Sequence, residues 1–399
     1  MRNDLLVASA ALLVLGVPVT AQAAPCADLP NPVYLQVGDT QEPLMKRLGQ
    51  KLRENTPNPI TIIYKTSGSC TNIDAIYNGT LLTTNPSYVP SMAEMPTWDP
   101  SQPSPTCDID PAGVDLDVTN SNVFIDACTA TPMPMGIAAF TGPVQPYLFV
   151  VPEASTQTAI TAEEAYFVFG FGAAGQVEPW NDEAFMFIRT TTKSTLISMA
   201  ANIGVPPNKM KGMPFDSSSQ VLNAVSTSVS PEKTIGLLGA EIYDQNRATV
   251  NALAFRTYGQ STAYYADSTK DSFDKRNVRD GHYSIWSPTV YLTHVDNQGN
   301  PVNANAGYVI DLILGNDVMP EPNFDALDVV VSGVKLVPNC AMSVQRASEG
   351  GPLSGYCPPE PCGCYFDSKL GTPADSCVPC TNNDACNGGV CRHGFCESR

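Results

Sequence analysis

The sequence predicts an α/β protein of two lobes, followed by a small disulfide-rich tail. Between residues 32 and 338, short β-branched runs alternate with amphipathic segments, which is typical of mainly parallel sheets covered by helices. The chain has 399 residues, 43% of them hydrophobic, which is enough for two separate cores. Nine of its 13 cysteines fall between Cys340 and Cys396, where hydrophobic periodicity is lacking, so we expect cross-links to hold this segment.

The N-terminus predicts export. Residues 5–19 form an apolar run that is too short to span a bilayer and is followed by small residues at positions 21–24. This pattern predicts a secretory signal peptide over residues 1–23 and a mature protein that is periplasmic, secreted or on the cell surface. No other stretch approaches a membrane span, so we expect no membrane insertion after cleavage. The high cysteine content fits an oxidising compartment.

The first lobe is expected over residues 24–145. Strands are predicted at 33–37 and 59–64, each followed by a turn and a helix, and a strand is expected to resume at 123–124. The stretch between them, residues 83–115, is rich in Pro, Ser and Asp and predicts a long surface excursion.

The second lobe is expected over residues 146–282, and the chain then returns to the first lobe over residues 283–345. Strands are predicted at 147–151, 185–188, 234–238, 283–286 and 290–292, and helices at 162–172, 194–203, 240–246 and 306–314. Residues 346–399 form the Cys-rich tail.

Three strand-to-helix turns place hydroxyl groups directly before a helix, at residues 38–40, 67–71 and 189–195. Helix N-termini leave backbone N–H groups unpaired and carry partial positive charge, so such turns can hold anions. A single turn of this kind is most often an ordinary helix cap. Three in one chain, one of them containing Arg189, favour an oxyanion site, because a guanidinium fork suits a tetrahedral anion.

Charge and motifs exclude several classes of function. The formal net charge of −17, without clustered Lys and Arg, excludes nucleic acid as a partner but not a small anion. The histidines His282, His294 and His393 lie in no metal-binding or general-base arrangement, and nucleophile-elbow, P-loop and dinucleotide motifs are absent from the sequence. We therefore expect neither an enzyme nor a cofactor nor a metal.

The cysteines leave two alternatives open. Cys70, at a predicted helix N-terminus, is either a nucleophile or, as the compartment favours, a disulfide partner of Cys26, Cys107 or Cys128. The tail could bind zinc through its cysteines and His393, but its spacings favour disulfides. Because 13 is odd, at least one thiol is free or bonded to another chain.

The order of motifs resembles the high-affinity periplasmic phosphate-binding proteins of ABC importers. The motifs are Gly38-x-Thr40, Tyr64-x3-Gly68-Ser69, residues 114–120, Trp180-Asn181-Asp182, Arg189-x3-Lys193-Ser194-Thr195, and Ile235-Gly236. The resemblance covers roughly residues 32–314 and leaves out the tail. It implies the type II periplasmic binding protein fold, in which two α/β lobes joined by crossover strands hold the ligand in a cleft. It also implies a monomer that binds phosphate and delivers it to an ABC permease.

The resemblance assigns ligand-binding positions. By this comparison the family's first-lobe hydroxyl donors fall on Thr40 and Ser69, and its arginine loop begins at Arg189. The same loop ends at Thr195, and its Ser-Gly pair is here replaced by Lys193 and Ser194.

One departure affects the choice of ligand. The family's aspartate, which accepts the ligand's proton, falls on Asn120, with Asn122 a nearby alternative. Such an aspartate repels fully deprotonated oxyanions, whereas an asparagine can accept or donate a hydrogen bond and relaxes this filter. The expected ligand is therefore a small oxyanion, with phosphate first.

A second hypothesis belongs to a different class of function. The departures at Asn120 and Lys193, together with the tail, are also compatible with a surface or matrix protein on the same scaffold. In that case the Cys-rich tail would mediate attachment or protein contacts.

Overall fold

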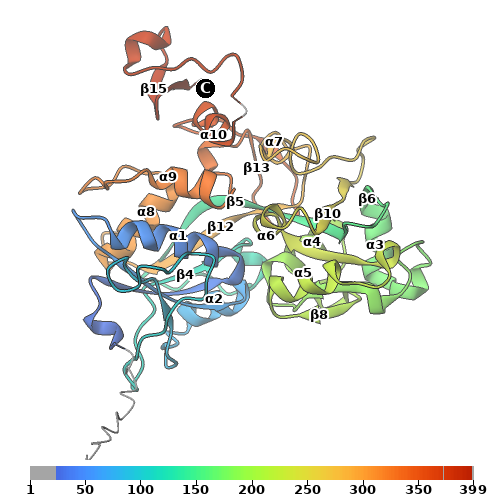
Figure 1. Cartoon of the computed structure of the whole chain (residues 1–399), viewed down its shortest axis with the longest axis horizontal. Helices are drawn as coiled ribbons and strands as arrows, with labels where there is room; N and C mark the ends of the chain where they lie inside the picture. The colour runs from blue at the N-terminus through green and yellow to red at the C-terminus, as the bar shows by residue number, and fades with distance from the viewer. Residues whose placement is uncertain (1–23, 372, 398–399) are drawn as a thin grey trace, which may run out of the picture.

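Two α/β lobes lie side by side, with the C-terminal region against both of them at the top of the view in Figure 1. The structure is a computed structural model and describes residues 24–371 and 373–397. The signal peptide expected over residues 1–23 lies outside the described residues. Within these ranges, no helix combines the length and the apolar character needed to cross a membrane.

The first lobe is built on parallel strands in the order β2-β1-β4, with β3 antiparallel at the outer edge and β12 antiparallel beside β4. These strands are β1 (Pro32–Gly38), β2 (Thr61–Ser67), β3 (Ser87–Tyr88), β4 (Val118–Ser121) and β12 (Trp286–His294), and the helices are α1 (Glu42–Arg53), α2 (Ser69–Tyr77), α8 (Ala304–Leu314) and α9 (Ala326–Asp328). Leu44, Leu48 and Leu52 recur at helical spacing on α1, and all are buried in the core of this lobe.

The second lobe repeats this plan with parallel strands in the order β9-β7-β8. Its strands are β6 (Ala159–Thr161), β7 (Met186–Arg189), β8 (Met213–Phe215), β9 (Ile235–Gly239), β10 (Val250–Ala252) and β11 (Ala254–Arg256), and its helices are α3 (Ala162–Phe171), α4 (Ser194–Ile203), α5 (Ser218–Ser226), α6 (Ala240–Gln245) and α7 (Arg276–Arg279). Fully buried aromatic side chains, including Phe149, Phe169 and Phe255, fill its core.

Strand β5 (Ile137–Pro152) joins the lobes. Its first part pairs antiparallel with β12 of the first lobe, from Ile137 opposite His294 to Pro146 opposite Trp286. Its second part pairs with β9 and β10 of the second lobe. The boundary expected between residues 145 and 146 falls within this strand. Strand β5 is therefore a covalent and hydrogen-bonded connection between the two cores (Figure 1).

Two sequence predictions of local structure were wrong. The strand expected at 123–124 is instead β4, which ends at Ser121, and Val123 leads into a short 3-10 turn. Strand β4 is buried although most of its residues are polar, so hydrophobicity did not mark it. Of the two strands expected at 283–286 and 290–292, the first is not a strand before Trp286, and Trp286 belongs with 290–292 to the single strand β12, which has an irregular register between Pro288 and Val290.

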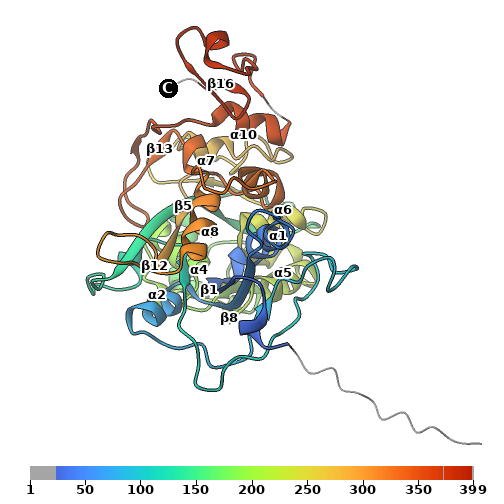
Figure 2. The same ribbon diagram turned by 90° about the vertical axis from the view of Figure 1, so that its left-hand side faces the viewer.

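The tail is held by disulfides, as expected from its composition. It contains α10 (Gly363–Leu370) and two small hairpins, β13 (Val344–Gln345) with β14 (Ser354–Gly355) and β15 (Val390–Arg392) with β16 (Phe395–Glu397). The bonds Cys340–Cys362, Cys364–Cys377, Cys380–Cys391 and Cys386–Cys396 cross-link it. Figure 2 shows this region at the top of the view, with α10, β13 and β16 labelled. Cys380, Cys386 and Cys391 lie close together, but all three are in disulfides, so their thiolates are not available to zinc.

The remaining cysteines settle the question of Cys70. Cys70 is bonded to Cys128, and Cys26 is bonded to Cys107, so both bridges stabilise the first lobe. Because Cys70 is bonded, it is not a thiolate nucleophile in this structure. Cys357, exposed in the tail, is the free cysteine among the described residues.

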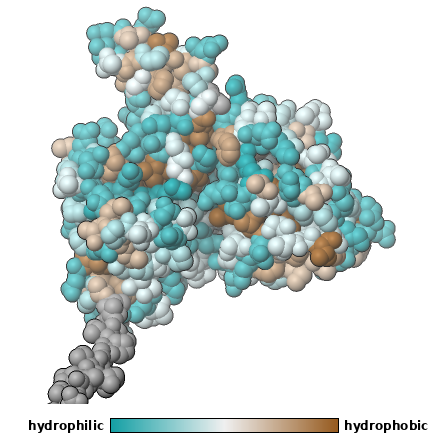
Figure 3. All heavy atoms as spheres, viewed as in Figure 1, coloured by the Kyte–Doolittle hydropathy of each residue, from teal (hydrophilic) through white to brown (hydrophobic). Residues whose placement is uncertain are grey.

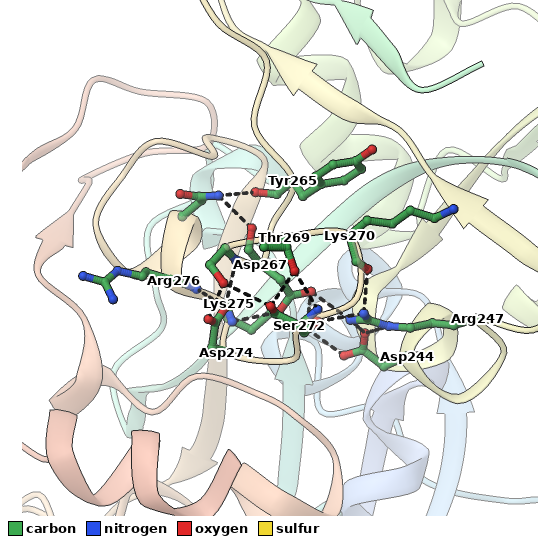
Figure 4. A network of polar contacts seen from close by, with 12 residues as sticks. Asp244, Arg247, Tyr265, Asp267, Thr269, Lys270, Ser272, Asp274, Lys275 and Arg276 are labelled. Atoms are coloured by element: carbon green, nitrogen blue, oxygen red, sulfur yellow. Dashed lines mark hydrogen bonds and ion pairs between the residues drawn. The ribbon is translucent and has the colours of Figure 1, made fainter. Parts of the chain in front are cut away.

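A buried cluster of charges fixes the loop around Lys275 against α6 (Figure 4). The Lys275 Nζ atom lies 2.8 Å from Asp244 Oδ2 and 2.9 Å from Asp267 Oδ1, and Arg247 Nη2 contacts both carboxylates at 2.5 and 2.8 Å. Burial alone would lower the pKa of Lys275, but the two aspartates raise it. Two cations face two carboxylates, so the cluster is balanced and offers no spare charge to a ligand.

Candidate anion site between the lobes

The chemically interesting side chains follow the carboxyl ends of the parallel strands in both lobes. Thr40 follows β1, Asn122 follows β4, Arg189 ends β7 and Glu241 follows β9. In open α/β sheets, ligands bind at this edge of the strands. Hydrogen bonds between these residues and their neighbours cross from one lobe to the other, as described below, so both edges meet at the boundary between the lobes.

Asn122 organises the first-lobe half of the site. Its backbone N–H donates to Ser69 Oγ at 3.0 Å, and its Nδ2 donates to Thr40 Oγ1. Asn120 donates from its Nδ2 to Asn122 Oδ1, and its own Oδ1 accepts from the Gly38 N–H at 2.8 Å. Predicted residues Thr40, Ser69 and Asn120 are thus brought together and buried. Asn120 mainly fixes the turn after β1, whereas Asn122 faces Thr40.

Arg189 is the central residue of the second-lobe half, and its side chain is fully buried. Its Nε donates to the Phe215 carbonyl at 3.2 Å and its Nη2 to the Asp216 carbonyl at 2.7 Å. Its Nη1 donates to Ser218 Oγ at 2.6 Å. The loop from β8 to α5 therefore holds the guanidinium in place without help from the first lobe.

The carboxylate of Asp39, from the first lobe, occupies the point at which the second-lobe donors converge. Its Oδ2 accepts from Arg189 Nη2 at 2.9 Å and from both the backbone N–H and the hydroxyl of Ser218 at 3.2 Å. Its Oδ1 lies 3.8 Å from Lys193 Nζ. Ser218 is the first residue of α5, so a helix N-terminus, an arginine and a lysine surround one carboxylate.

Ser194 and Thr195 lie at the N-terminus of α4. The Ser194 side chain hydrogen-bonds with Tyr147, whose hydroxyl donates to the Asn122 carbonyl at 2.6 Å. Complete burial raises the pKa of Tyr147 well above its ordinary value, so this hydroxyl stays a neutral donor. The Thr195 hydroxyl is also buried and has no hydrogen-bond partner among the residues that the structure describes.

A chain of buried amides crosses from the first lobe to Glu241. Gln145 Oε1 accepts from Gln41 and Asn122, each at 3.1 Å, and Gln145 Nε2 donates to Glu241 Oε2 at 2.6 Å. Burial, together with the negative charge of Asp39, raises the pKa of Glu241 to about 8. Glu241 is therefore mostly neutral at pH 7, and its Oε1 lacks a partner within the described part of the chain.

Several residues of this site were not among those predicted from the sequence. The structure places Arg189 and Lys193 around Asp39, but the sequence-based site included neither Asp39 nor Ser218. The Ser217-x-x-Gln220 capping box before the apolar pair at 221–222 marks the start of α5 and could have pointed to Ser218. Asp39 lies in the turn at residues 38–40, which was singled out for its hydroxyl group. Its negative charge, opposite to that of Arg189 and Lys193, was the signal that it could pair with a cation.

Known structures with a similar fold were found, although no family model and no curated protein matches the sequence. One is a protein from Clostridium perfringens described as a candidate phosphate ABC transporter substrate-binding protein with bound phosphate. It is 12% identical with a TM-score of 0.53, and the match covers 77% of this chain and 99% of that one. The fold is that of the two-lobed type II periplasmic binding proteins.

Two further structures have lower scores. An ABC-type phosphate transport receptor from Vibrio cholerae is 15% identical with a TM-score of 0.42, covering 66% of this chain and 88% of that one. The reduced form of the OxyR regulatory domain from Pseudomonas aeruginosa is 9% identical with a TM-score of 0.40, covering 71% and 98%. At these identities the likeness concerns the fold, and function has to be argued from the site.

Proposed function

We propose that this protein binds a small oxyanion between its two lobes, at Arg189, Lys193 and Ser218. The observation that carries the proposal is the convergence of Arg189 Nη2, the Ser218 N–H and the Ser218 hydroxyl on a single carboxylate oxygen. Such an arrangement suits phosphate or sulfate oxygens as well as a carboxylate, because all are anionic acceptors. The buried, unpartnered Thr195 hydroxyl offers one more donor from the same lobe.

Phosphate is the first ligand to test. The structurally similar Clostridium perfringens protein is described with bound phosphate, which supports this choice for the same fold. Apart from Asp39, the first-lobe half of the site here is made of neutral amides and hydroxyls, and Glu241 is mostly neutral at pH 7. Positions 120 and 122 hold asparagine, so neither provides a fixed carboxylate that would repel a fully ionised oxyanion such as sulfate. We therefore expect the protein to discriminate less against such anions than it would with an aspartate at these positions.

The proposed role is uptake rather than catalysis. A protein exported by the signal peptide of residues 1–23 would hold its ligand outside the cytoplasmic membrane and deliver it to an ABC permease. The charged groups at the proposed site hold each other in hydrogen-bonded pairs, and we assign none of them a catalytic step.

Isothermal titration of the mature protein with phosphate, sulfate, arsenate and a phosphonate tests the proposal. The protein is first unfolded and dialysed so that any carried-over ligand is removed. We expect saturable one-to-one binding of at least one of these anions. Arg189→Met, which keeps the side-chain volume but removes the charge, should lose binding by at least about 100-fold, because a buried anion would then lack its counter-charge.

Arg256→Met is the matched control. Arg256 also belongs to the second lobe, at the end of β11, but its side chain is partly exposed, and among the described residues its ion pair is with Glu163. Arg189→Lys is a second variant that retains the charge without the fork, and we expect intermediate affinity. Wild-type affinity in Arg189→Met, with a folded circular-dichroism spectrum, would remove the site assignment, and no binding of any anion by the wild type would remove the function.

A further inference from the structure

We infer that Asp39 is a tethered competitor of the ligand, a carboxylate from the first lobe that occupies the anion position in the second lobe until an oxyanion displaces it. This inference rests on the proposed function, because it describes how the same site is regulated. Beyond the proposed function, it gives Asp39 a role in selectivity, because only ligands able to replace a carboxylate can bind.

The donors around Asp39 do not depend on it. Arg189 is fixed by the Phe215 and Asp216 carbonyls and by Ser218, all from its own lobe. When the carboxylate leaves, Arg189 keeps these contacts, while its remaining N–H, the Ser218 N–H and the Ser218 hydroxyl are freed together. These groups form a prepared site for a second anion, and no rearrangement of the second lobe is needed to expose it.

The Asp39 interaction also links the two lobes. Asp39 lies in the turn after β1, 150 residues before Arg189 in the chain, and the two side chains meet across the lobe boundary. The side chain of Arg189 is fully buried, and that of Asp39 is 18% exposed. A charge-assisted bond at such a place is stronger than a surface ion pair, because water screens it less.

Asp39 therefore does for the lobes what a bound oxyanion would do. It neutralises Arg189, satisfies the N-terminus of α5 and holds the first lobe against the second. An incoming ligand has to break these contacts, so its apparent affinity is reduced by the fraction of molecules in which Asp39 still occupies the site. A ligand with more charge or more acceptor atoms than a carboxylate is favoured in this competition.

The experiment removes the competitor and measures both consequences. Asp39→Ala deletes the carboxylate, and Asp39→Asn keeps its shape without the charge. Titration with phosphate should show affinity about tenfold or more above wild type in Asp39→Ala, with Asp39→Asn between the two. Small-angle scattering without ligand should show a larger radius of gyration for Asp39→Ala than for wild type, and phosphate should reverse this expansion.

Asp74→Asn is the matched control. It makes the same change of charge at an exposed position on α2 of the first lobe, and the Asp74 carboxylate makes no hydrogen bond or ion pair with the described residues. We expect its affinity and its scattering to equal those of the wild type.

The outcomes separate the inference from the proposed function. If wild type binds phosphate and Asp39→Ala binds it equally or more weakly, Asp39 is not a competitor and the inference is overturned while the proposed function stands. If neither protein binds any of the four anions, the proposed function fails and the competition with it. Small-angle scattering tests the other half of the inference, that Asp39 holds the lobes together. An unchanged radius of gyration in Asp39→Ala would show that it does not.

Discussion

Glu241 is the buried acid at the end of the amide chain that crosses the lobes, and its protonation links pH to stability. In the folded protein its pKa is raised from 4.5 to about 8, chiefly by burial. The folded state therefore keeps a proton that the unfolded state releases above pH 4.5. The stabilising effect of that proton is present at low pH and is lost as the pH rises from 4.5 to about 8, at up to about 1.4 kcal/mol per pH unit.

We expect Glu241→Gln to remove this part of the pH dependence. Glutamine has the same shape, stays neutral and can still accept a hydrogen bond from Gln145. Urea unfolding between pH 5 and 8 should show the free energy of unfolding of the wild type falling more steeply than that of the variant. Other buried acids, such as Glu349, remain in both proteins, so the difference between the two slopes isolates Glu241. Parallel slopes would contradict the assignment.

The residues of the site were predictable only where their own neighbourhood in the sequence marks them. The hydroxyl-rich turns before α2 and α4 stand out locally, which is why Ser69, Arg189 and Thr195 could be singled out. The contact of Asp39 with Arg189 joins positions 150 residues apart, and nothing in either turn specifies its partner. Resemblance to a family pointed to the arginine loop but not to Ser218, which the loop from β8 to α5 supplies.

At the scale of elements, the turns before α2 and α4 touch each other across the lobe boundary. Gly68 precedes α2, and the Cys70 N–H donates to the Thr192 carbonyl of the opposite lobe at 3.4 Å. A Cβ on Gly68 would lie 2.7 Å from both the carbonyl oxygen and the hydroxyl of Thr192. The absence of a side chain at position 68 is therefore a condition for the lobes to approach.

Gly68→Ala should weaken the approach of the lobes without disturbing either core. Its backbone φ of −90° suits alanine, so the cost of about 1–3 kcal/mol arises from the contact with Thr192 and falls on the closed arrangement. Small-angle scattering should show a more expanded protein than wild type. Gly355→Ala, where an added Cβ meets nothing within 4 Å, is the control and should leave the scattering unchanged. Identical scattering of all three proteins would show that this contact does not limit closure.

The elements themselves were largely predictable, because apolar periodicity marks most of them. The helix spacing of α1 and the short apolar run of β9 were both visible in the sequence, and the structure contains them. The first half of β5 was not predicted, since its Gly142, Pro143 and Pro146 are typical of turns. Strand β4 was misplaced because most of its buried side chains are polar, and hydropathy does not register the long-range hydrogen bond of Asn120 with Gly38 or the local one of Ser121.

At the scale of the whole molecule, the chain contacts both lobes where the first lobe ends and the tail begins. We call residues 343–351 the strap. Near its end, Glu349 Oε1 accepts from Ser287 of β12 at 2.7 Å, and the Glu349 side chain also hydrogen-bonds with Ser198 of α4 in the second lobe. Gly350 packs directly against Ala201 of the same helix. The tail is thus not an independent appendage, since its connection contacts both lobes (Figures 1 and 2).

The surface of the molecule has the ordinary mixture of hydrophobic and hydrophilic residues, so the strap has to act through its own individual contacts. In the face drawn in Figure 3, hydrophobic residues form separate patches among hydrophilic ones, which is usual for a protein surface. Coupling between tail and lobes therefore has to be sought in specific contacts of the strap, such as those of the Glu349 carboxyl group. Burial is the main reason that its pKa is raised, and the hydrogen bond from Ser287 partly offsets this effect.

Glu349→Ala should destabilise the protein by about 1–3 kcal/mol, because it leaves the hydroxyls of Ser198 and Ser287 and the N–H of Phe124 without their buried acceptor. Glu349→Gln retains an acceptor oxygen and should lose less. Glu321→Ala changes an exposed acid of the first lobe and should unfold with the wild type. If the strap couples the lobes, Glu349→Ala will also make the ligand-free protein more expanded in small-angle scattering. A loss of stability with unchanged scattering would mean that Glu349 stabilises its surroundings while the lobes are held together from the opposite side, by Asp39 and the turn at Gly68.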